Sequence, residues 1–226
     1  MRCSKEELQI SALYKEEGKS LAYPYLQEFA YPWEALSAIK RIISEIAKSL
    51  PRDMFEEISP DVFVAKSARI APTAYIGAPA IICEDAEVRH GAFIRGSAIV
   101  GRGAVVGNST ELKNCILFDG VQVPHFNYVG DSILGYKAHM GAGAVTSNVK
   151  SDKSYVAVRC LGKTVETCCR KFGAMLGDYV EVGCNSVLNP GTVIGRYTNV
   201  YPLSSVRGYV PPESIYKSEF KIVKKR

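Results

Sequence analysis

A period of six residues runs through most of this sequence and constrains its fold more than any other feature. Counted in sixes from Val64, ten of eleven positions carry a large apolar residue. The positions are Val64, Ile70, Ile76, Ile82, Val88, Ile94, Val100, Val106, Leu112, Phe118 and Pro124. An alanine follows four residues after each of the first seven, from Ala68 to Ala104. Chance would produce such agreement on the order of once in 10⁴ to 10⁵ trials.

A six-residue period predicts short strands joined by turns. Because side chains alternate along a strand, one large aliphatic residue per hexad points inward, and the alanine fills the crowded corner. Three hexads make one coil of about 18 residues, and stacked coils bury a core that no single coil could bury. A second run covers Leu176 to Val206, and Val129, Leu134 and Met140 join the runs with one residue deleted. We therefore predict an all-β fold, a parallel β-helix, over residues 59–212.

Residues 1–58 are predicted to be a separate, helical N-terminal segment. Its apolar residues from Trp33 to Leu50 follow one another at spacings of three and four, and Pro51 ends the pattern. This spacing predicts an amphipathic helix. We expect the segment to cap the first coil or to pack on a neighbouring subunit.

Two further segments depart from the repeat. Residues 147–175 interrupt it and are predicted to form a protruding hairpin with Gly162 in the turn. A long insertion in a repeat protein usually lies on the binding face. Residues 213–226 follow the last coil and are predicted to be a basic tail.

Composition excludes several classes of function. The net charge of +5 is too small and too scattered to indicate nucleic-acid binding. No apolar run of membrane-spanning length occurs, and the N-terminus lacks the apolar core of a signal peptide, so we expect a cytoplasmic protein without membrane partners. The seven cysteines include no C-x-x-C pair, so we expect free thiols and no metal site.

Two cations lie one coil apart. Arg95 and Lys113 are separated by three hexads, and each directly follows an inward aliphatic residue. They should stack on one edge, roughly 5 Å apart. Stacked cations repel unless an anion lies between them, and phosphate is the natural anion. The alternative is two solvated charges beside acidic neighbours such as Glu111.

A histidine stands on a different edge of the predicted coils. His125 follows Lys113 by two hexads, and in a trimer the edges of adjacent subunits face one another. His125 could therefore meet the cation pair of a neighbour. Histidine exchanges protons readily near neutral pH and can act as general base toward an amine. The alternative is a surface histidine without a role.

Three stretches carry a family resemblance. Gly107–Asn114, His125–Asp131 and Met140–Gly143 resemble the acetyltransferase domain of bifunctional UDP-N-acetylglucosamine pyrophosphorylase/glucosamine-1-phosphate N-acetyltransferase. The family pattern runs G-N-x-x-E-x-K-N, then H-x-x-Y-x-G-D, then N-x-G-A-G. The match is close over about residues 88–148 and generic over 172–212.

The stretch from Gly162 to Gly195 is also similar to the C-terminal domains of archaeal sugar-phosphate nucleotidylyltransferases. The resemblance implies a left-handed β-helix, a homotrimer, and acetyl transfer from acetyl-CoA to an amino-sugar 1-phosphate. The nucleotidyltransferase half is expected to be absent, because no Gly-rich phosphate loop precedes the coils.

The resemblance also implies roles for particular residues. His125 would be the general base, and Arg95, Lys113 and Tyr128 would hold the sugar phosphate. Ala142, Asn148 and Cys184 would line the acetyl-CoA groove. His139 stands where the family has asparagine, so it would contact the substrate and leaves the identity of the acceptor open. The family's loop lysine has no unique counterpart here, and Lys150 and Lys153 both remain candidates.

Three other functions compete with this one. A γ-class carbonic anhydrase needs three histidines around zinc, and the spacing of His90, His125 and His139 does not favour it. A non-catalytic β-helical scaffold would need no histidine or cation pair. Acetyl transfer to another amino sugar or to a nucleotide-linked sugar remains an alternative.

Overall fold

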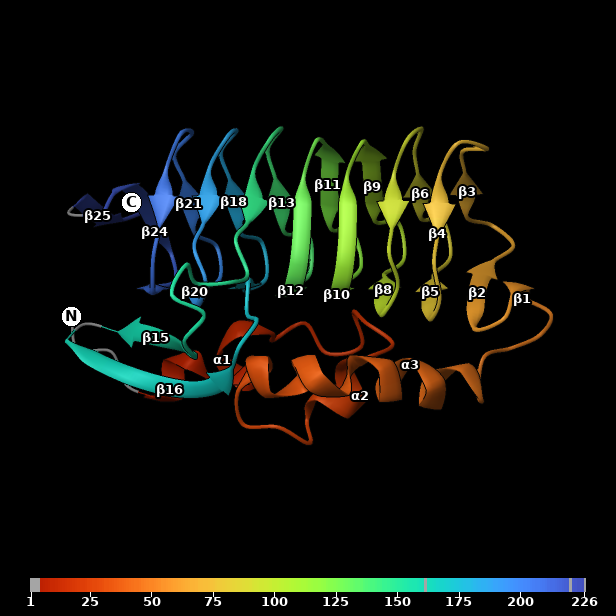
Figure 1. Ribbon diagram of the computed structural model, residues 1–226, viewed down its shortest axis with the longest axis horizontal. Helices are drawn as coiled ribbons and strands as arrows, with labels where there is room; N and C mark the ends of the chain where they lie inside the picture. The colour runs from red at the N-terminus through yellow and green to blue at the C-terminus, as the bar shows by residue number, and fades with distance from the viewer. Residues whose placement is uncertain (1–4, 161, 220, 226) are drawn as a thin grey trace.

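The computed structural model describes residues 5–160, 162–219 and 221–225, which form a β-helix flanked along one side by short helices (Figure 1). The fold is the predicted left-handed parallel β-helix of the hexapeptide-repeat type, with about nine turns. The helices precede it in the chain and are η1 (Lys5–Leu8), α1 (Ile10–Leu13), α2 (Tyr23–Leu26), η2 (Pro32–Ala38) and α3 (Ile39–Ala47). No helix in these ranges is long and apolar enough to cross a membrane.

Each coil contributes one short strand to each of three faces, and each strand pairs in parallel with the strands one coil away. The first face holds β4 (Tyr75–Ile76), β7 (Phe93–Ile94), the beginnings of β10 (Glu111–Leu117) and β12 (Tyr128–Leu134), β14 (Val145–Thr146), β19 (Val187–Leu188) and β22 (Ser205–Val206).

The second face holds β2 (Val62–Ala65), β5 (Ala80–Ile82), β8 (Ala98–Val100), the ends of β10 and β12, β17 (Ala174–Leu176), β20 (Thr192–Ile194) and β23 (Tyr209–Val210). The third face holds β3 (Arg69–Ile70), β6 (Glu87–Val88), β9 (Val105–Asn108), β11 (Gln122–His125), β13 (His139–Met140), β18 (Glu181–Val182), β21 (Asn199–Val200) and β24 (Ser214–Ser218).

The inward positions of the repeat form the core. Val88, Ile94, Val106 and Leu112 are each at most 1% exposed, and the alanines at the corners, such as Ala104, are buried as well. Burying one such aliphatic side chain stabilises the fold by about 1.5–3 kcal/mol. The six-residue period is therefore confirmed as the source of the core.

The register changes one position earlier than the sequence suggested. Val100 pairs with Leu117 and Val106 pairs with Val123, so Leu117 and Val123, not Phe118 and Pro124, continue the inward columns, and each of these steps is one residue short of three hexads. Lys113 accordingly pairs with Gly130 and not with Asp131.

The second face is buried on both sides. From β5 to β20 its outward residues are fully buried, namely Ile81, Ile99, Ile116, Ile133, Met175 and Val193. Helix α3 packs on β5, β8 and β10, and the Trp33 ring lies 5.7 Å from that of Phe172. The helices of the N-terminal segment therefore lie along this face (Figure 1). Strand β1 (Phe55–Ser59), in which this segment ends, pairs antiparallel with β2 and covers the first coil.

The chain leaves the β-helix between β14 and β17. There, β15 (Val156–Cys160) and β16 (Lys163–Cys169) form an antiparallel hairpin. At the C-terminal end, β24 continues the third face and β25 (Lys221–Lys224) pairs back on it antiparallel. The β-helix therefore extends beyond residue 212, and the tail expected there is largely a strand pair.

The prediction of free thiols is wrong for one cysteine. Cys160 is disulfide-bonded. Five other cysteines are free, namely Cys83, Cys115, Cys168, Cys169 and Cys184.

Candidate active site

Most of the site residues named from the sequence gather at two corners that border the first face. Where the chain leaves this face, Arg95, Lys113, Asp131 and Asn148 occur on successive coils, and we call this the Lys113 corner. Where the chain enters the face, His125, Ala142 and Cys184 occur on successive coils, and we call this the His125 corner. Strand β14 lies between the two corners within one coil, so the corners border opposite ends of the same face.

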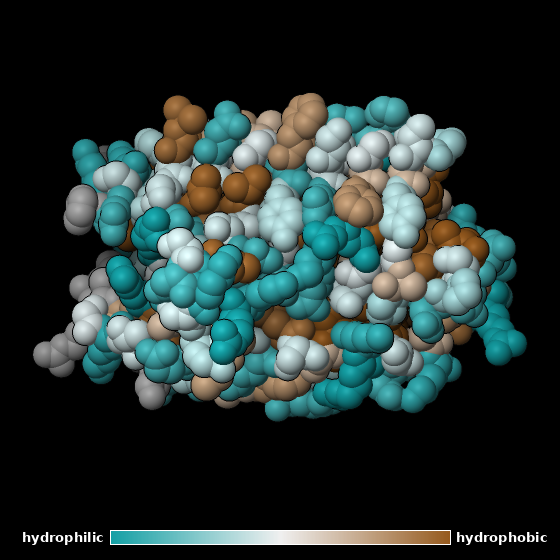
Figure 2. Space-filling view, in the orientation of Figure 1, coloured by the Kyte–Doolittle hydropathy of each residue, from teal (hydrophilic) through white to brown (hydrophobic). Residues whose placement is uncertain are grey.

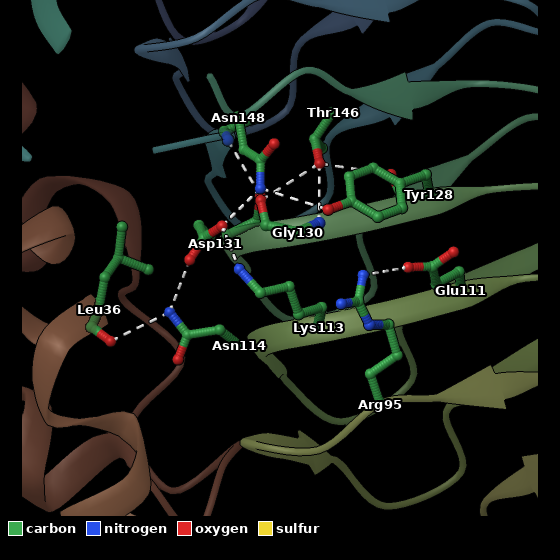
Figure 3. Close-up of polar contacts among 12 residues, drawn as sticks. Leu36, Arg95, Glu111, Lys113, Asn114, Tyr128, Gly130, Asp131, Thr146 and Asn148 are labelled. Carbon is green, nitrogen blue, oxygen red and sulfur yellow. Dashed lines mark hydrogen bonds and ion pairs between the residues drawn. The ribbon is translucent and has the colours of Figure 1, made fainter. Parts of the chain in front are cut away.

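A buried carboxylate organises the Lys113 corner (Figure 3). The Asp131 side chain is 6% exposed and accepts hydrogen bonds from Lys113 Nζ at 3.1 Å and Asn114 Nδ2 at 2.9 Å. Asn148 Nδ2 donates a further, short hydrogen bond to the same carboxylate. The Lys113 side chain remains 25% exposed. Lys113 is thus held by Asp131 while part of it faces solvent.

Tyr128 lies over this group of side chains. Its hydroxyl accepts a hydrogen bond of 3.3 Å from Asn148 Nδ2. A Cβ atom at Gly130 would lie 2.4 Å from that hydroxyl, so only glycine lets the ring fold across the strand at this point. Burial, and then the charges of Asp131 and Glu111, raise the pKa of Tyr128. The phenol therefore stays protonated and can donate a hydrogen bond.

Arg95 is the more exposed of the two predicted cations. Its Nη1 atom lies 2.9 Å from Oε1 of Glu111, and its side chain is 46% exposed. Arg95 N also donates to Leu112 O, which puts Arg95 one coil from Lys113 on the same corner. The stacking of the two cations follows from this register. Each cation has an acidic partner, so the four charges of Arg95, Glu111, Lys113 and Asp131 cancel.

The His125 corner contains small residues beside an exposed imidazole. His125 O accepts from Gly143 N at 3.0 Å, and Ala142 O accepts from Asn185 N at 2.9 Å, which fixes the stacking of the corner. The His125 side chain is exposed, and within the described residues its ring makes no hydrogen bond. Cys184 is exposed in the same column. The ring is therefore free to meet a substrate or another subunit.

His139 lies apart from both corners. It belongs to β13 on the third face, and its Nδ1 lies 2.8 Å from Glu181 Oε2. Of the two candidate loop lysines, Lys150 pairs with Asp152 at 3.5 Å, and Lys153 is exposed at a left-handed turn position. Among the described residues, no three His, Cys, Asp or Glu side chains are grouped so that they could hold a metal ion.

Sequence reasoning assigned no role to Asp131, Asn114 or the N-terminal segment at this site. Asn114 Nδ2 also donates to Leu36 O at 3.2 Å, which ties the corner to η2. Asp131 ends the quoted stretch His125–Asp131, so its place in the motif was the available signal. Its partners come from the coils on either side and could not be named from spacing alone.

Comparison with known proteins gives matches along most of the chain. The family model described as the GMPPB C-terminal domain matches residues 76–200. The bifunctional protein GlmU of Methanococcus maripaludis strain S2 is 36% identical over 208 residues, which cover 89% of this chain and 50% of the relative. A bifunctional sugar-1-phosphate nucleotidylyltransferase/acetyltransferase of Sulfurisphaera tokodaii is 37% identical over 94 residues, covering 42% of this chain and 23% of the relative.

The chain therefore spans about half the length, or less, of the curated relatives it matches. Among solved structures, the acetyltransferase domain of PglB from Neisseria gonorrhoeae in complex with acetyl coenzyme A is 13% identical. The alignment covers 83% of this chain and 65% of that one, with a TM-score of 0.34. An overlap of this size carries no argument about function.

Proposed function

This chain belongs to the GMPPB C-terminal domain family, and on that premise we propose that it transfers the acetyl group of acetyl-CoA to an amino-sugar phosphate of the glucosamine-1-phosphate type. One observation carries the proposal: a cation pair with a tyrosine, and a histidine whose ring has no hydrogen bond to any described residue and lies beside small residues, border the same exposed face. The names of the relatives support it, since one is a sugar-1-phosphate nucleotidylyltransferase/acetyltransferase.

The Lys113 corner suits a sugar phosphate. The ion pair of Arg95 and Glu111 is exposed and screened by water, so it holds the two side chains together only weakly. A phosphate, which offers the guanidinium two oxygens at once, can therefore displace Glu111 from Arg95. Lys113 has three N–H donors and gives one to Asp131, which leaves two for the phosphate. The protonated Tyr128 hydroxyl supplies another donor.

The His125 corner supplies the base. The nitrogen lone pair of the amino sugar attacks the thioester carbonyl, the C–S bond breaks, and the thiolate of CoA leaves. The proton lost by the nitrogen passes to the His125 imidazole and from there to the thiolate. Ala142 and Cys184 leave room beside the ring for the thioester, because their side chains are small.

A cationic pocket between the hairpin and the last coils suits the phosphates of acetyl-CoA. Lys150, Arg159 and Arg207 line it. Within the described residues, neither Arg159 nor Arg207 has an ion-pair partner, so both can pair with phosphate oxygens. The position of the pocket gives the hairpin a part in binding.

We further propose that the protein acts as a homotrimer, with His125 of one subunit meeting the Lys113 corner of the next. The second face is covered by helices, whereas the first face exposes Tyr75 (60%), Phe93 (43%) and Val187 (38%). Figure 2 shows apolar patches among polar ones on the side where β10 and β12 face the viewer. A surface of this mixed kind suits contact between subunits.

The test is CoA release measured against a panel of acceptors. The panel contains glucosamine-1-phosphate, galactosamine-1-phosphate, a nucleotide-linked amino sugar and unphosphorylated glucosamine. We expect the amino-sugar 1-phosphates to be acetylated and free glucosamine to react far more slowly. Equal rates with phosphorylated and free glucosamine would exclude the phosphate site. A folded protein that releases CoA with none of the four acceptors would exclude the activity.

A further inference from the structure

We propose that Asp131 is a positioning residue of this site: its carboxylate holds Lys113 in the geometry that receives the phosphate of the acceptor. The inference rests on the proposed function, because it names the group that prepares the phosphate-binding side chains. Asp131 itself is buried beneath them and does not reach the substrate.

The hydrogen bonds of Asp131 account for the burial of its charge. A buried carboxylate is costly unless it is paired and hydrogen-bonded. Here Oδ2 accepts from Lys113 Nζ and from Asn148 Nδ2, and Oδ1 accepts from Asn114 Nδ2. Lys113 and Asn114 belong to the coil before Asp131, and Asn148 belongs to the coil after it. One carboxylate thus ties together side chains that the repeat alone would leave independent.

Asp131 also lies where three parts of the chain meet. Asn114 Nδ2 donates one hydrogen bond to Asp131 Oδ1 and another to Leu36 O of η2. On the other side, the base of the hairpin is fixed because Gly173 N donates to Asp131 O at 2.8 Å and Phe172 N donates to Asn148 O at 2.9 Å. Contacts with the N-terminal segment and with the base of the hairpin thus both help to fix the position of Asp131.

The effect on Lys113 follows from the flexibility of lysine. A free lysine side chain samples many rotamers and loses that entropy when a ligand fixes it. The bond to Asp131 fixes Lys113 before the substrate arrives, and two of its three donors remain for the phosphate. Loss of the carboxylate charge should therefore weaken the binding of the sugar phosphate.

The backbone makes Asp131→Asn a clean test. Asp131 has φ +48°, and Asn114 one coil earlier has φ +49°. Asparagine tolerates this left-handed conformation at least as well as aspartate. The substitution therefore keeps shape and backbone and removes the charge.

We expect Asp131→Asn to raise KM for glucosamine-1-phosphate by about tenfold, with kcat and KM for acetyl-CoA nearly unchanged. The matched control is Asp119→Asn, which removes a buried carboxylate paired with Arg102 at 3.3 Å on another corner. The control should leave all three constants at the wild-type level. A wild-type KM for Asp131→Asn, or an equal rise in the control, would overturn the proposal.

A double variant keeps the test valid if Asp131→Asn alone fails to fold. Lys113→Gln with Asp131→Asn removes both charges, so no buried charge is left unpaired. If Asp131 acts through Lys113, the double variant has the same KM for the sugar phosphate as Lys113→Gln alone. A further rise of similar size in the double variant contradicts the proposal.

A measurement without substrate separates this inference from the proposed function. Acylation of lysines by an amine-reactive ester, followed by mass spectrometry, reports how accessible Lys113 is. We expect labelling of Lys113 to rise severalfold in Asp131→Asn, with the exposed Lys137 unchanged as the internal reference. Unchanged labelling of Lys113 would overturn the inference even if the enzyme acetylates its acceptor. Increased labelling in a protein that acetylates no acceptor would instead refute the proposed function.

Discussion

At the scale of single residues, the proposed proton transfer depends on the imidazole of His125. His125→Ala should lower kcat by about 10²–10⁴-fold, which is the usual contribution of a general base. The melting temperature should not change, because the side chain is exposed and its ring has no hydrogen bond within the described residues.

His90→Ala is the matched control for this substitution, since His90 is exposed on the same edge of the coils, and within the described part of the chain its ring bonds to the Thr73 hydroxyl alone. It should keep wild-type kcat. A His125→Ala protein that keeps both its melting temperature and its kcat would mean that another group removes the proton, and His139 would be the next residue to test.

The phosphate-binding role belongs to two further residues. Arg95→Ala and Lys113→Ala should each raise KM for the sugar phosphate by about ten- to hundredfold, because each removes a charge-assisted hydrogen bond to the phosphate. KM for acetyl-CoA should stay near the wild-type value. Steady-state kinetics with each substrate varied in turn measures both constants. A rise confined to KM for acetyl-CoA would mean that Arg95 and Lys113 bind acetyl-CoA and not the sugar phosphate.

Spacing was enough to bring these residues together. The separation of Arg95 and Lys113 by one full coil predicted one shared corner, and the structure has them there. The spacing in the sequence does not show that each of the two cations has an acidic partner. Asp131 reaches Lys113 across the coil that is one residue short, and its bond to Asn114 depends on how η2 lies against the coils. Such contacts depend on tertiary packing, which a one-dimensional period does not encode.

The contact between the N-terminal segment and the second face is the main interaction at the scale of elements. Ile99 points outward from β8 and is fully buried under this segment. Ile99→Ala should lower the free energy of unfolding by about 2–5 kcal/mol, as expected for a buried isoleucine. Ile58→Ala in β1, where the side chain is 52% exposed, should cost less than about 1 kcal/mol. Urea unfolding at one fixed protein concentration compares them, and equal losses would mean that the helices do not cover this face.

The sequence contains a further pattern that indicates the contact between the helices and the second face. An inward aliphatic residue once per hexad explains Ile82 and Val100, but the residues just before them, Ile81 and Ile99, are apolar as well. A second aliphatic column at the coil period indicates a face buried on both sides, as in other parallel sheets. The helical spacing from Trp33 onward likewise predicted an apolar stripe on a helix. Neither the helical spacing nor the second aliphatic column shows that these two apolar surfaces pack against each other. The shift from Phe118 and Pro124 to Leu117 and Val123 was not predicted, because a one-residue deletion leaves an apolar residue at either position of each pair.

The whole molecule is proposed to be a trimer with its sites between subunits. Light scattering should give three times the 24.7 kDa mass of one chain. Mixing His125→Ala with Lys113→Ala, after dissociation and reassembly, should restore part of the activity, because some sites then combine an intact His125 with an intact Lys113 corner. An active monomer, or mixed variants that regain nothing while wild-type protein survives the same treatment, would contradict the shared site.

The central claim is that this chain makes an N-acetylated sugar phosphate. The most direct measurement is mass spectrometry of the sugar product after incubation of the wild-type protein with acetyl-CoA and glucosamine-1-phosphate, beside His125→Ala at the same concentration and melting temperature. We expect N-acetylglucosamine-1-phosphate from the wild type and at least about a hundredfold less from the variant. A folded wild-type trimer that yields no N-acetylated product, or a variant that yields as much as the wild type, would contradict the claim.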